Sequence, residues 1–171
     1  MTLMTFTYQE AARTPGMKIL LAIDDSSFTG PAIQAVITRG HNDDTEVRVL
    51  QVVKPPSLLS LNDMGGYDLA LAEDWDEETE QAHVLVGMTA DTLRSHGMKV
   101  RTSVEQGDSE STILNAAEKW YADLIVLGAR GGRGFWHLWR DGLSDAIVLH
   151  ARCSVEIVRV LPGHKETLAA S

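Results

Sequence analysis

The sequence predicts a single-domain α/β protein, in which a doubly wound, mostly parallel β-sheet carries helices on both faces. Short apolar runs alternate along the chain with segments whose apolar residues recur every three or four positions, a pattern typical of strands alternating with amphipathic helices. The 171 residues, of which 44% are hydrophobic and 23% charged, suffice for one substantial core but not comfortably for two. Right-handed crossovers between successive strands then place the helices on either side of the sheet.

Each predicted strand is a short apolar run. These runs lie at residues 18–23, 47–53, 98–104, 124–127 and 154–160. The first is almost continuously apolar, which is typical of a strand buried on both faces of a parallel sheet. The second stops before Pro55 and Pro56, which have no backbone N–H to donate to a neighbouring strand.

Helical segments separate the predicted strands. Helices are predicted from Pro31 to Gly40, from Glu73 to His96, after Gly107-Asp108-Ser109, and from about Leu138 to His150. Proline is tolerated in the first turn of a helix, and either Ser27 or Thr29 could cap that helix. Gly97 follows the longest helix at the position where a left-handed residue commonly ends one. Residues 57–72 are expected to form a long loop.

Residues 17–160 are expected to form the domain, between a flexible N-terminal arm at 1–16 and a C-terminal tail at 161–171. The arm lacks the basic start and continuous apolar run of a secretory signal, and no stretch approaches the roughly 20 apolar residues that cross a bilayer. Cys153 is the only cysteine, which excludes an internal disulfide and a thiolate metal cluster. These features predict a cytoplasmic protein.

The distribution of charged residues argues against some classes of binding partner. A formal net charge of −9 argues against a general binder of nucleic acids or anionic membranes, because both need a basic surface. From Pro55 to Asp91 the chain holds nine acidic residues and neither lysine nor arginine. The simplest interpretation is the solvated face of the long helix. The alternative is a lid or docking surface above a ligand cleft, since long loops in compact domains are often functional.

A glycine-rich segment, GARGGRG at residues 128–134, follows the fourth predicted strand. Glycine permits positive φ and lets backbone N–H groups close around an anion, and the start of the following helix favours negative charge. The segment matches neither the Walker A pattern nor the dinucleotide G-x-G-x-x-G pattern. The residues therefore leave two interpretations open, a phosphate-binding loop or a tight strand-to-helix turn.

Three longer segments carry a family pattern: MKILLAIDDS at 17–26, QGDSESTILNAAEKWYADLIVLGARGG at 106–132, and LSDAIVLHARCSVEIV at 143–158. With the order of elements, they resemble the universal stress protein family over about residues 17–160. The resemblance implies a five-stranded parallel sheet in the order 3-2-1-4-5, the adenine-nucleotide alpha-hydrolase-like fold. It also implies a non-catalytic stress-response regulator that forms homodimers through the last strand, residues 154–160. Many members of this family bind ATP at the ends of strands one and four.

The same resemblance implies a set of nucleotide-binding residues in this chain. They are Ala22, Asp24, Val52, Leu127, Gly128, Arg130, Gly131, Arg133, Gly142, Leu143 and Ser144. Asp24 matches an acidic residue that lies against the adenosine, and Val52 matches a position whose backbone reads the adenine edge. A turn or capping role would equally explain Asp24, and a place in the core would equally explain Val52.

One position departs from the family motif, which runs from Gly128 and Gly131 across nine residues to Gly-Ser or Gly-Thr. Here the sequence reads Asp141-Gly142 at that point. A carboxylate near phosphates is unfavourable, because like charges ~4 Å apart repel by about 1 kcal/mol even in water. Arginines at 130, 133 and 140 could offset the charge, or Asp141 could recruit Mg²⁺ to bridge it to a phosphate. The alternative is a nucleotide-free, dimeric interaction module.

Two other classes of protein fit the sequence less well. Asp24 and Asp25 also look like the acidic pair of phosphorylation receivers, but such domains need an aspartate after strand three and a lysine after strand five. The corresponding residues are Glu105-Gln106 and Arg159-Val160-Leu161. An enzyme is not expected, because no Ser-His-Asp order, pair of catalytic carboxylates or metal triad stands out. The cluster of Phe135, Trp136 and Trp139 is interpreted as a core or dimer contact.

Overall fold

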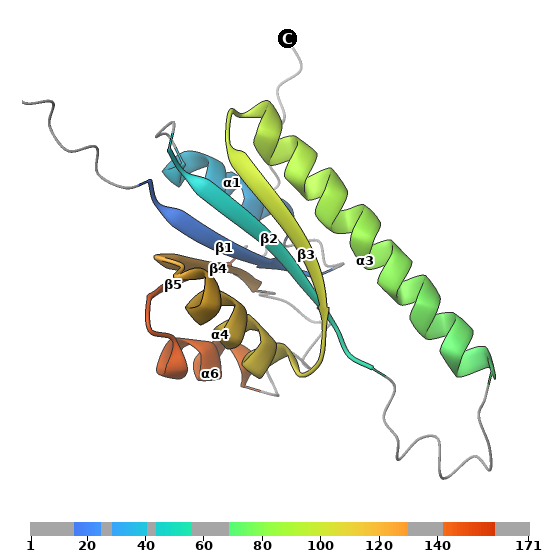
Figure 1. Ribbon diagram of the computed structural model, residues 1–171. Coiled ribbons are helices and arrows are strands. Elements are labelled where there is room, and N and C mark those ends of the chain that lie inside the picture. Colours follow the sequence, from blue (N-terminus) through green and yellow to red (C-terminus); the bar gives the residue numbers. More distant parts are fainter. Residues whose placement is uncertain (1–15, 25–28, 41–43, 56–68, 130–141, 160–171) are drawn as a thin grey trace, which may run out of the picture.

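The computed structural model describes residues 16–24, 29–40, 44–55, 69–129 and 142–159. Its elements are β1 (Lys18–Ile23), α1 (Thr29–Arg39), β2 (Glu46–Val53), α3 (Leu69–Ser95), β3 (Lys99–Gln106), α4 (Ser109–Trp120), β4 (Leu124–Ala129), α6 (Leu143–His150) and β5 (Ser154–Arg159). The strands form one parallel sheet in the order β3-β2-β1-β4-β5 (Figure 1). This confirms the predicted fold class and strand order.

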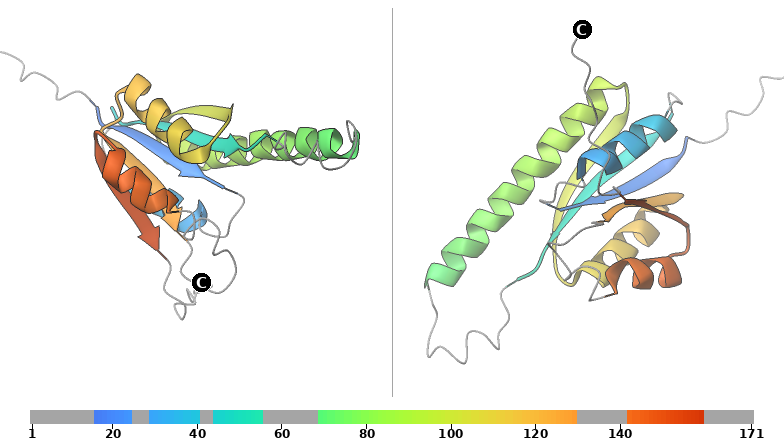
Figure 2. Two further views of the ribbon diagram at one scale, coloured as in Figure 1. Left: turned by 90° about the horizontal axis from the view of Figure 1, so that it is seen from below. Right: turned by 180° about the vertical axis from the view of Figure 1, so that it is seen from behind.

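The helices form a layer on each face of the sheet, α1 and α3 on one and α4 and α6 on the other (Figures 1 and 2). Successive residues of a strand point to opposite faces, so β1 supplies both cores. Ile19 and Leu21 pack in the core beneath α1 and α3, whereas Leu20 packs in the core beneath α4 and α6. All three side chains are fully buried, as the continuous apolar run predicted.

Two helix ends have the predicted geometry. Gly97 has a left-handed φ of 83°, its N–H donates to the carbonyl of Arg94 at 2.9 Å, and the N–H of Met98 donates to the carbonyl of Leu93 at 3.3 Å. This pair of bonds is the Schellman motif, which satisfies carbonyls at the end of α3. At the start of α4, the side chain of Asp108 accepts the N–H of Ser111.

Three predicted boundaries are wrong. Residues 69–72, expected in a loop, belong to α3, because Leu-Ala-Leu-Ala is a run of strong helix formers that extends the acidic helix. β3 runs two residues beyond Val104, where Glu105 and Gln106 continue the pairing with β2. A single helix over 138–150 is excluded because Gly142, with a left-handed φ of 67°, precedes α6 as its N-cap.

Candidate functional site

The carboxyl ends of β1, β2 and β4 meet at the point where the strand order reverses. β1 lies between β2 and β4, with Ala22 opposite Leu50 on one side and Leu127 on the other. Asp24 follows the end of β1, and Gly128 lies one residue beyond Leu127 on β4. Ligands of open α/β sheets bind in the crevice outside the strand ends at such a switch point. The geometry therefore defines a candidate ligand site at this edge.

Four residues predicted to bind nucleotide share one apolar cluster. Ala22 of β1, Val52 of β2, Leu127 of β4 and Leu143 of α6 belong to the core beneath α4 and α6. Leu127 is buried, and the other three are half-buried. Side chains from three strands and the first turn of α6 thus come together near the switch point, and they supply an apolar surface of the kind that small-molecule sites use.

Asp24 takes part in the turn that leads from β1 to α1. Its backbone carbonyl accepts a hydrogen bond from the hydroxyl of Thr29 at 2.8 Å, and the residue is half-buried. Thr29 is one of the two residues that the sequence offered as a cap for this helix. This contact indicates that the backbone of Asp24 helps to form the turn. A position of Asp24 beside a ligand remains a prediction from the sequence.

Within the described ranges, no side chain caps the start of α6. Gly142 occupies the N-cap with φ 67° and ψ 16°, and it makes no side-chain hydrogen bond to the first turn, whereas Asp108 caps α4. The N–H groups of a helix's first turn have no partner within the helix, and they carry the positive end of its dipole. Ser144 lies in that turn and is half-buried. This arrangement suits an anion that approaches α6 from the strand edge.

The remaining predicted site residues lie outside the described part of the chain. These are Arg130, Gly131 and Arg133 of the glycine-rich segment. Asp141, the departure from the family motif, lies outside it as well, as do Phe135, Trp136 and Trp139. Their roles remain predictions from the sequence.

Sequence reasoning overlooked Gln51. Its side-chain oxygen is buried and has no hydrogen-bond partner among the residues that the structure describes, and its backbone lies opposite Ile23 of β1. A buried, unpaired polar atom calls for an explanation, and one of these is a polar ligand group. The sequence did contain a sign of this residue, because a single amide side chain stands within the apolar run that forms β2. Gln51 precedes Val52, but strand alternation directs its side chain toward the face that carries α1 and α3.

Neither a metal site nor a membrane span emerges from the described residues. No group of three or more His, Cys, Asp or Glu side chains in these ranges could hold a metal ion. Among the described helices, none is both long enough and apolar enough to cross a bilayer.

The strand order, which reverses at β1 and β4, and the helices on both faces define a doubly wound α/β fold. A sequence model of the universal stress protein family matches residues 17–159, so the chain belongs to that family. It is 26% identical over 149 residues to universal stress protein Sll1388 of Synechocystis, covering 83% of this chain and 97% of the relative. It is 28% identical over 142 residues to universal stress protein MJ0531 of Methanocaldococcus jannaschii, covering 83% and 81%.

Solved structures share the fold. The protein MJ0577 superposes with a TM-score of 0.71 at 20% identity, covering 87% of this chain and 99% of that one. Universal stress protein UspA of Lactobacillus plantarum gives a TM-score of 0.68 at 22% identity, covering 85% and 99%. Family members of the same fold have been solved with dAMP (from Archaeoglobus fulgidus), with AMP (from Arabidopsis thaliana) and with cAMP.

Proposed function

We propose that this protein binds an adenine nucleotide at the β1–β4 switch point, with its phosphates at the start of α6 and its base near Val52. The observation that carries the proposal is the start of α6, where Gly142 leaves the first-turn N–H groups without a capping side chain. Phosphate binding to such N–H groups uses both their hydrogen bonds and the helix dipole. The apolar cluster of Ala22, Val52, Leu127 and Leu143 offers a surface for the base.

The structures of relatives with dAMP, AMP and cAMP support an adenine ligand over other nucleotides. We include ATP among the candidates, held with help from Gly128, Gly131 and the guanidinium groups of Arg130 and Arg133. Mg²⁺ would enter only with the nucleotide, bridging a phosphate to Asp141. In this proposal the protein is a non-catalytic stress-response regulator of the cytoplasm, whose domain spans residues 17–160.

The proposal includes a homodimer formed through β5. This strand ends the sheet on one side, and an edge strand can pair with the same strand of a second copy. Val148 and Leu149 are exposed large apolar residues on α6, the helix that precedes β5 and contacts it. A second copy at this edge would bury apolar surface together with the strand.

Thermal denaturation with AMP, ADP, ATP and cAMP, each with and without Mg²⁺, tests the ligand. A nucleotide at 100 times its Kd should stabilise the protein by about 2.7 kcal/mol. Gly128→Ala should reduce that stabilisation, because a Cβ would narrow the backbone approach to the phosphates. Gly87→Ala is the matched control, since nothing lies within 4 Å of a Cβ built at this glycine of α3.

The double variant Asp141→Gly, Gly142→Ser restores the family motif and should bind ATP more tightly than the natural chain, because the carboxylate near the phosphates is removed. The left-handed φ of 67° at position 142 should lower the stability of this variant without ligand, so the shift with ATP is measured against each protein's own ligand-free value. If no nucleotide stabilises either protein, the ligand proposal is wrong. The nucleotide-free, dimeric interaction module would then be the better explanation, and the homodimer could be measured independently by sedimentation.

A further inference from the structure

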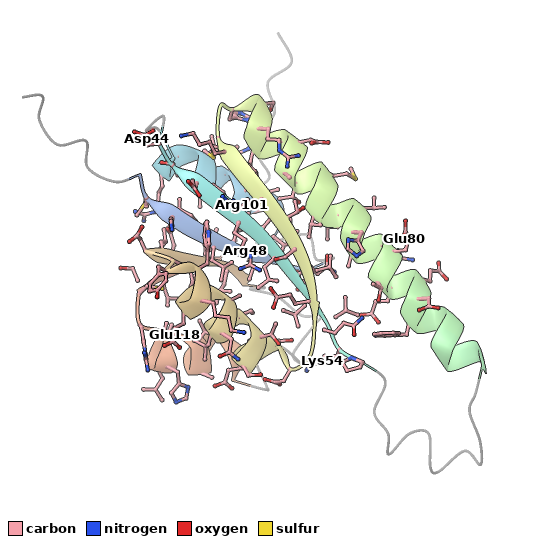
Figure 3. The ribbon with its side chains drawn as sticks, in the orientation of Figure 1. Asp44, Arg48, Lys54, Glu80, Arg101 and Glu118 are labelled. Atoms are coloured by element: carbon pink, nitrogen blue, oxygen red, sulfur yellow. The ribbon has the colours of Figure 1, made fainter. Side chains whose placement is uncertain are left out.

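One face of the edge strand β3 carries an exposed arginine. β3 ends the sheet next to β2, and Arg101 of β3 pairs with Arg48 of β2. Leu50, two positions further along β2, packs in the core beneath α4 and α6. Side chains two apart on a strand share a face, so Arg48 and Arg101 lie on the α4 side of the sheet. Figure 3 shows no described helix in front of these two arginines, and Arg101 is exposed.

Three further cations lie on or beside the same face. Lys18 of β1 and Lys99 of β3 both pair with Glu46 of β2. Glu46 precedes Arg48 by two positions, so these side chains also lie on the α4 side. Lys119 is exposed on α4 itself. We call this group the basic face; its members are Lys18, Arg48, Lys99, Arg101 and Lys119.

Lys119 lies on the flank of α4 that is turned away from α6. The next residue, Trp120, packs in the core, and its backbone carbonyl accepts a hydrogen bond from Nζ of Lys18 at 3.4 Å. The preceding residue, Glu118, contacts Arg152, which follows α6. Each residue of a helix is turned by 100° from the one before it, so Lys119 projects from the opposite flank, which borders β2.

Protection of the sheet edge explains only part of this arrangement. Edge strands often carry charged residues that discourage pairing with another chain, which accounts for Lys99 and Arg101. Arg48 lies on the second strand, where its Nε donates to the hydroxyl of Ser103 at 3.2 Å and its Nη2 contacts Glu105 at 2.7 Å. Arg48 is nonetheless paired with Arg101, and like charges opposite each other destabilise a sheet. An anion over the two guanidinium groups would offset that repulsion.

Only part of the basic face is neutralised within the chain. Glu105 pairs with Arg48, and a carboxylate oxygen of Asp44 lies 3.3 Å from the amine of Lys99. The other three cations form no ion pair with the described residues, and Glu46 can offset only one of them. Positive charge is therefore in excess here, although the whole chain has a formal net charge of −9. A negatively charged partner is repelled by the molecule as a whole and attracted at this face.

We propose that the basic face binds an acidic segment of another protein, whose carboxylates lie between Lys119 on α4 and Arg101 on β3. A guanidinium group binds a carboxylate through two parallel hydrogen bonds, and Arg101 makes no hydrogen bond to the described residues that would compete. Glu46 and Glu105 lie within the face and would repel a continuous row of phosphates. Carboxylates spaced along a peptide can avoid these two acids, which favours an acidic peptide over a nucleic acid.

The basic face is separate from the proposed nucleotide site and from β5. Arg48 and Arg101 lie near the amino ends of their strands, whereas the nucleotide site lies at the carboxyl ends. β5 forms the opposite edge of the sheet. An acidic segment and a nucleotide can therefore bind independently. Ion pairs at a surface contribute little each and are screened by salt, so the binding should be weak and should fall as the salt concentration rises.

Fluorescence anisotropy at low salt, with a labelled peptide of alternating glutamate and serine and the full chain, tests the proposal. Arg101→Gln and Lys119→Gln should each weaken binding about fivefold. Arg152→Gln removes the same charge from the α6 side of α4 and is the matched control, which should leave the affinity unchanged. Arg101→Gln also removes the repulsion with Arg48, so its thermal midpoint should equal or exceed that of the natural chain, which separates lost binding from unfolding.

Two results with the peptide would overturn the proposal: no binding to the natural chain, or equal affinities for the natural chain, Arg101→Gln and Arg152→Gln. A labelled single-stranded oligonucleotide of the same net charge is the second probe. Tighter binding of the oligonucleotide than of the peptide, weakened by Arg101→Gln, would assign the face to nucleic acid instead. Self-association of the natural chain in sedimentation, lost in Arg101→Gln, would assign it to a second copy and would likewise overturn the proposal.

Discussion

The backbone N–H of Ser111 donates to the carboxylate of Asp108 at 3.0 Å, and the hydroxyl of Ser111 lies 3.1 Å from the same oxygen. Asp108 thereby caps α4. Asp108→Ala removes this acceptor and should lower the free energy of unfolding by about 1 kcal/mol, within the usual range for an N-cap. Urea denaturation measures the change. Asp108→Asn should retain most of the stability, because an amide oxygen can still accept the N–H.

The same contact predicts a pH dependence. The N–H of Ser111 lowers the pKa of Asp108 below its ordinary value of 3.8; desolvation opposes this shift, and the Ser111 hydroxyl and the charge of Lys54 add smaller contributions in the same direction as the N–H. A carboxyl whose pKa is lower in the folded state stabilises the fold above its unfolded pKa. That contribution disappears as the pH falls from about 3.8 through the folded-state value. The natural chain and Asp108→Asn should therefore converge in stability below this window, and a constant difference between them would contradict the assignment.

Local signals in the sequence predicted much of the fold. Asp108 follows Gly107 at a helix start, Gly97 follows the last turn of α3, and the alternating apolar runs gave all five strands. Each of these depends on residues adjacent in the chain. The wrong boundaries depended on more than such signals. Pairing with β2 keeps Glu105 and Gln106 in a strand. Leu69 lies in α3, as its helix propensity favours, but the residues just before it in the sequence are typical of a loop and obscured this.

Gly142 should tolerate alanine poorly for a conformational reason alone. Its φ is 67°, and no atom of the described residues lies within 4 Å of a Cβ built on it, so substitution meets backbone strain without a clash against them. Gly142→Ala should destabilise the fold by about 1–2 kcal/mol, the usual cost of the left-handed region for a residue with a Cβ. Gly142→Asn, which adopts this region more readily, should cost less. Equal effects of both variants in thermal denaturation would show that α6 begins differently.

The candidate site was less predictable than the fold. The sequence pattern predicted that Asp24 and Gly128 lie at the ends of strands, and in the structure the sheet brings these two ends together. Val52, Leu127 and Leu143 were predicted through the family resemblance, because their apolar side chains are of the same kind as those of other core residues and give no sign of a binding role. Gln51 escaped notice because its significance depends on whether its buried oxygen finds a partner, which only the packed structure reveals.

Gln51→Met tests what the unpaired oxygen does. Replacing a buried, unsatisfied amide with an apolar side chain of similar size should leave stability unchanged or raise it, since the desolvation cost of about 1–3 kcal/mol is removed. Thermal denaturation without ligand measures this effect, with Gln34→Met at an exposed position of α1 as the control. Lower stability of Gln51→Met would mean that the amide has a partner in the folded protein.

The ion pair between Arg39 of α1 and Glu156 of β5 joins a helix to an edge strand. Nε lies 2.5 Å from Oε2, and the side chains are 52% and 26% exposed. The pair between Arg152 and Glu118 has the same separation, 2.5 Å, with side chains 81% and 54% exposed. Because solvent screens the second pair more, a double-mutant cycle should give coupling of roughly 0.5–1 kcal/mol for the first and near zero for the second.

Urea denaturation of the two single variants and the double variant measures each cycle, with Arg39→Met and Glu156→Gln for the first pair and Arg152→Met and Glu118→Gln for the second. Arg39→Met should cost more alone than in the presence of Glu156→Gln, since it leaves the buried Oε2 of Glu156 without its cation. Raising the salt concentration should reduce the first coupling only in part. Equal couplings for both pairs would show that burial at β5 adds nothing to this contact.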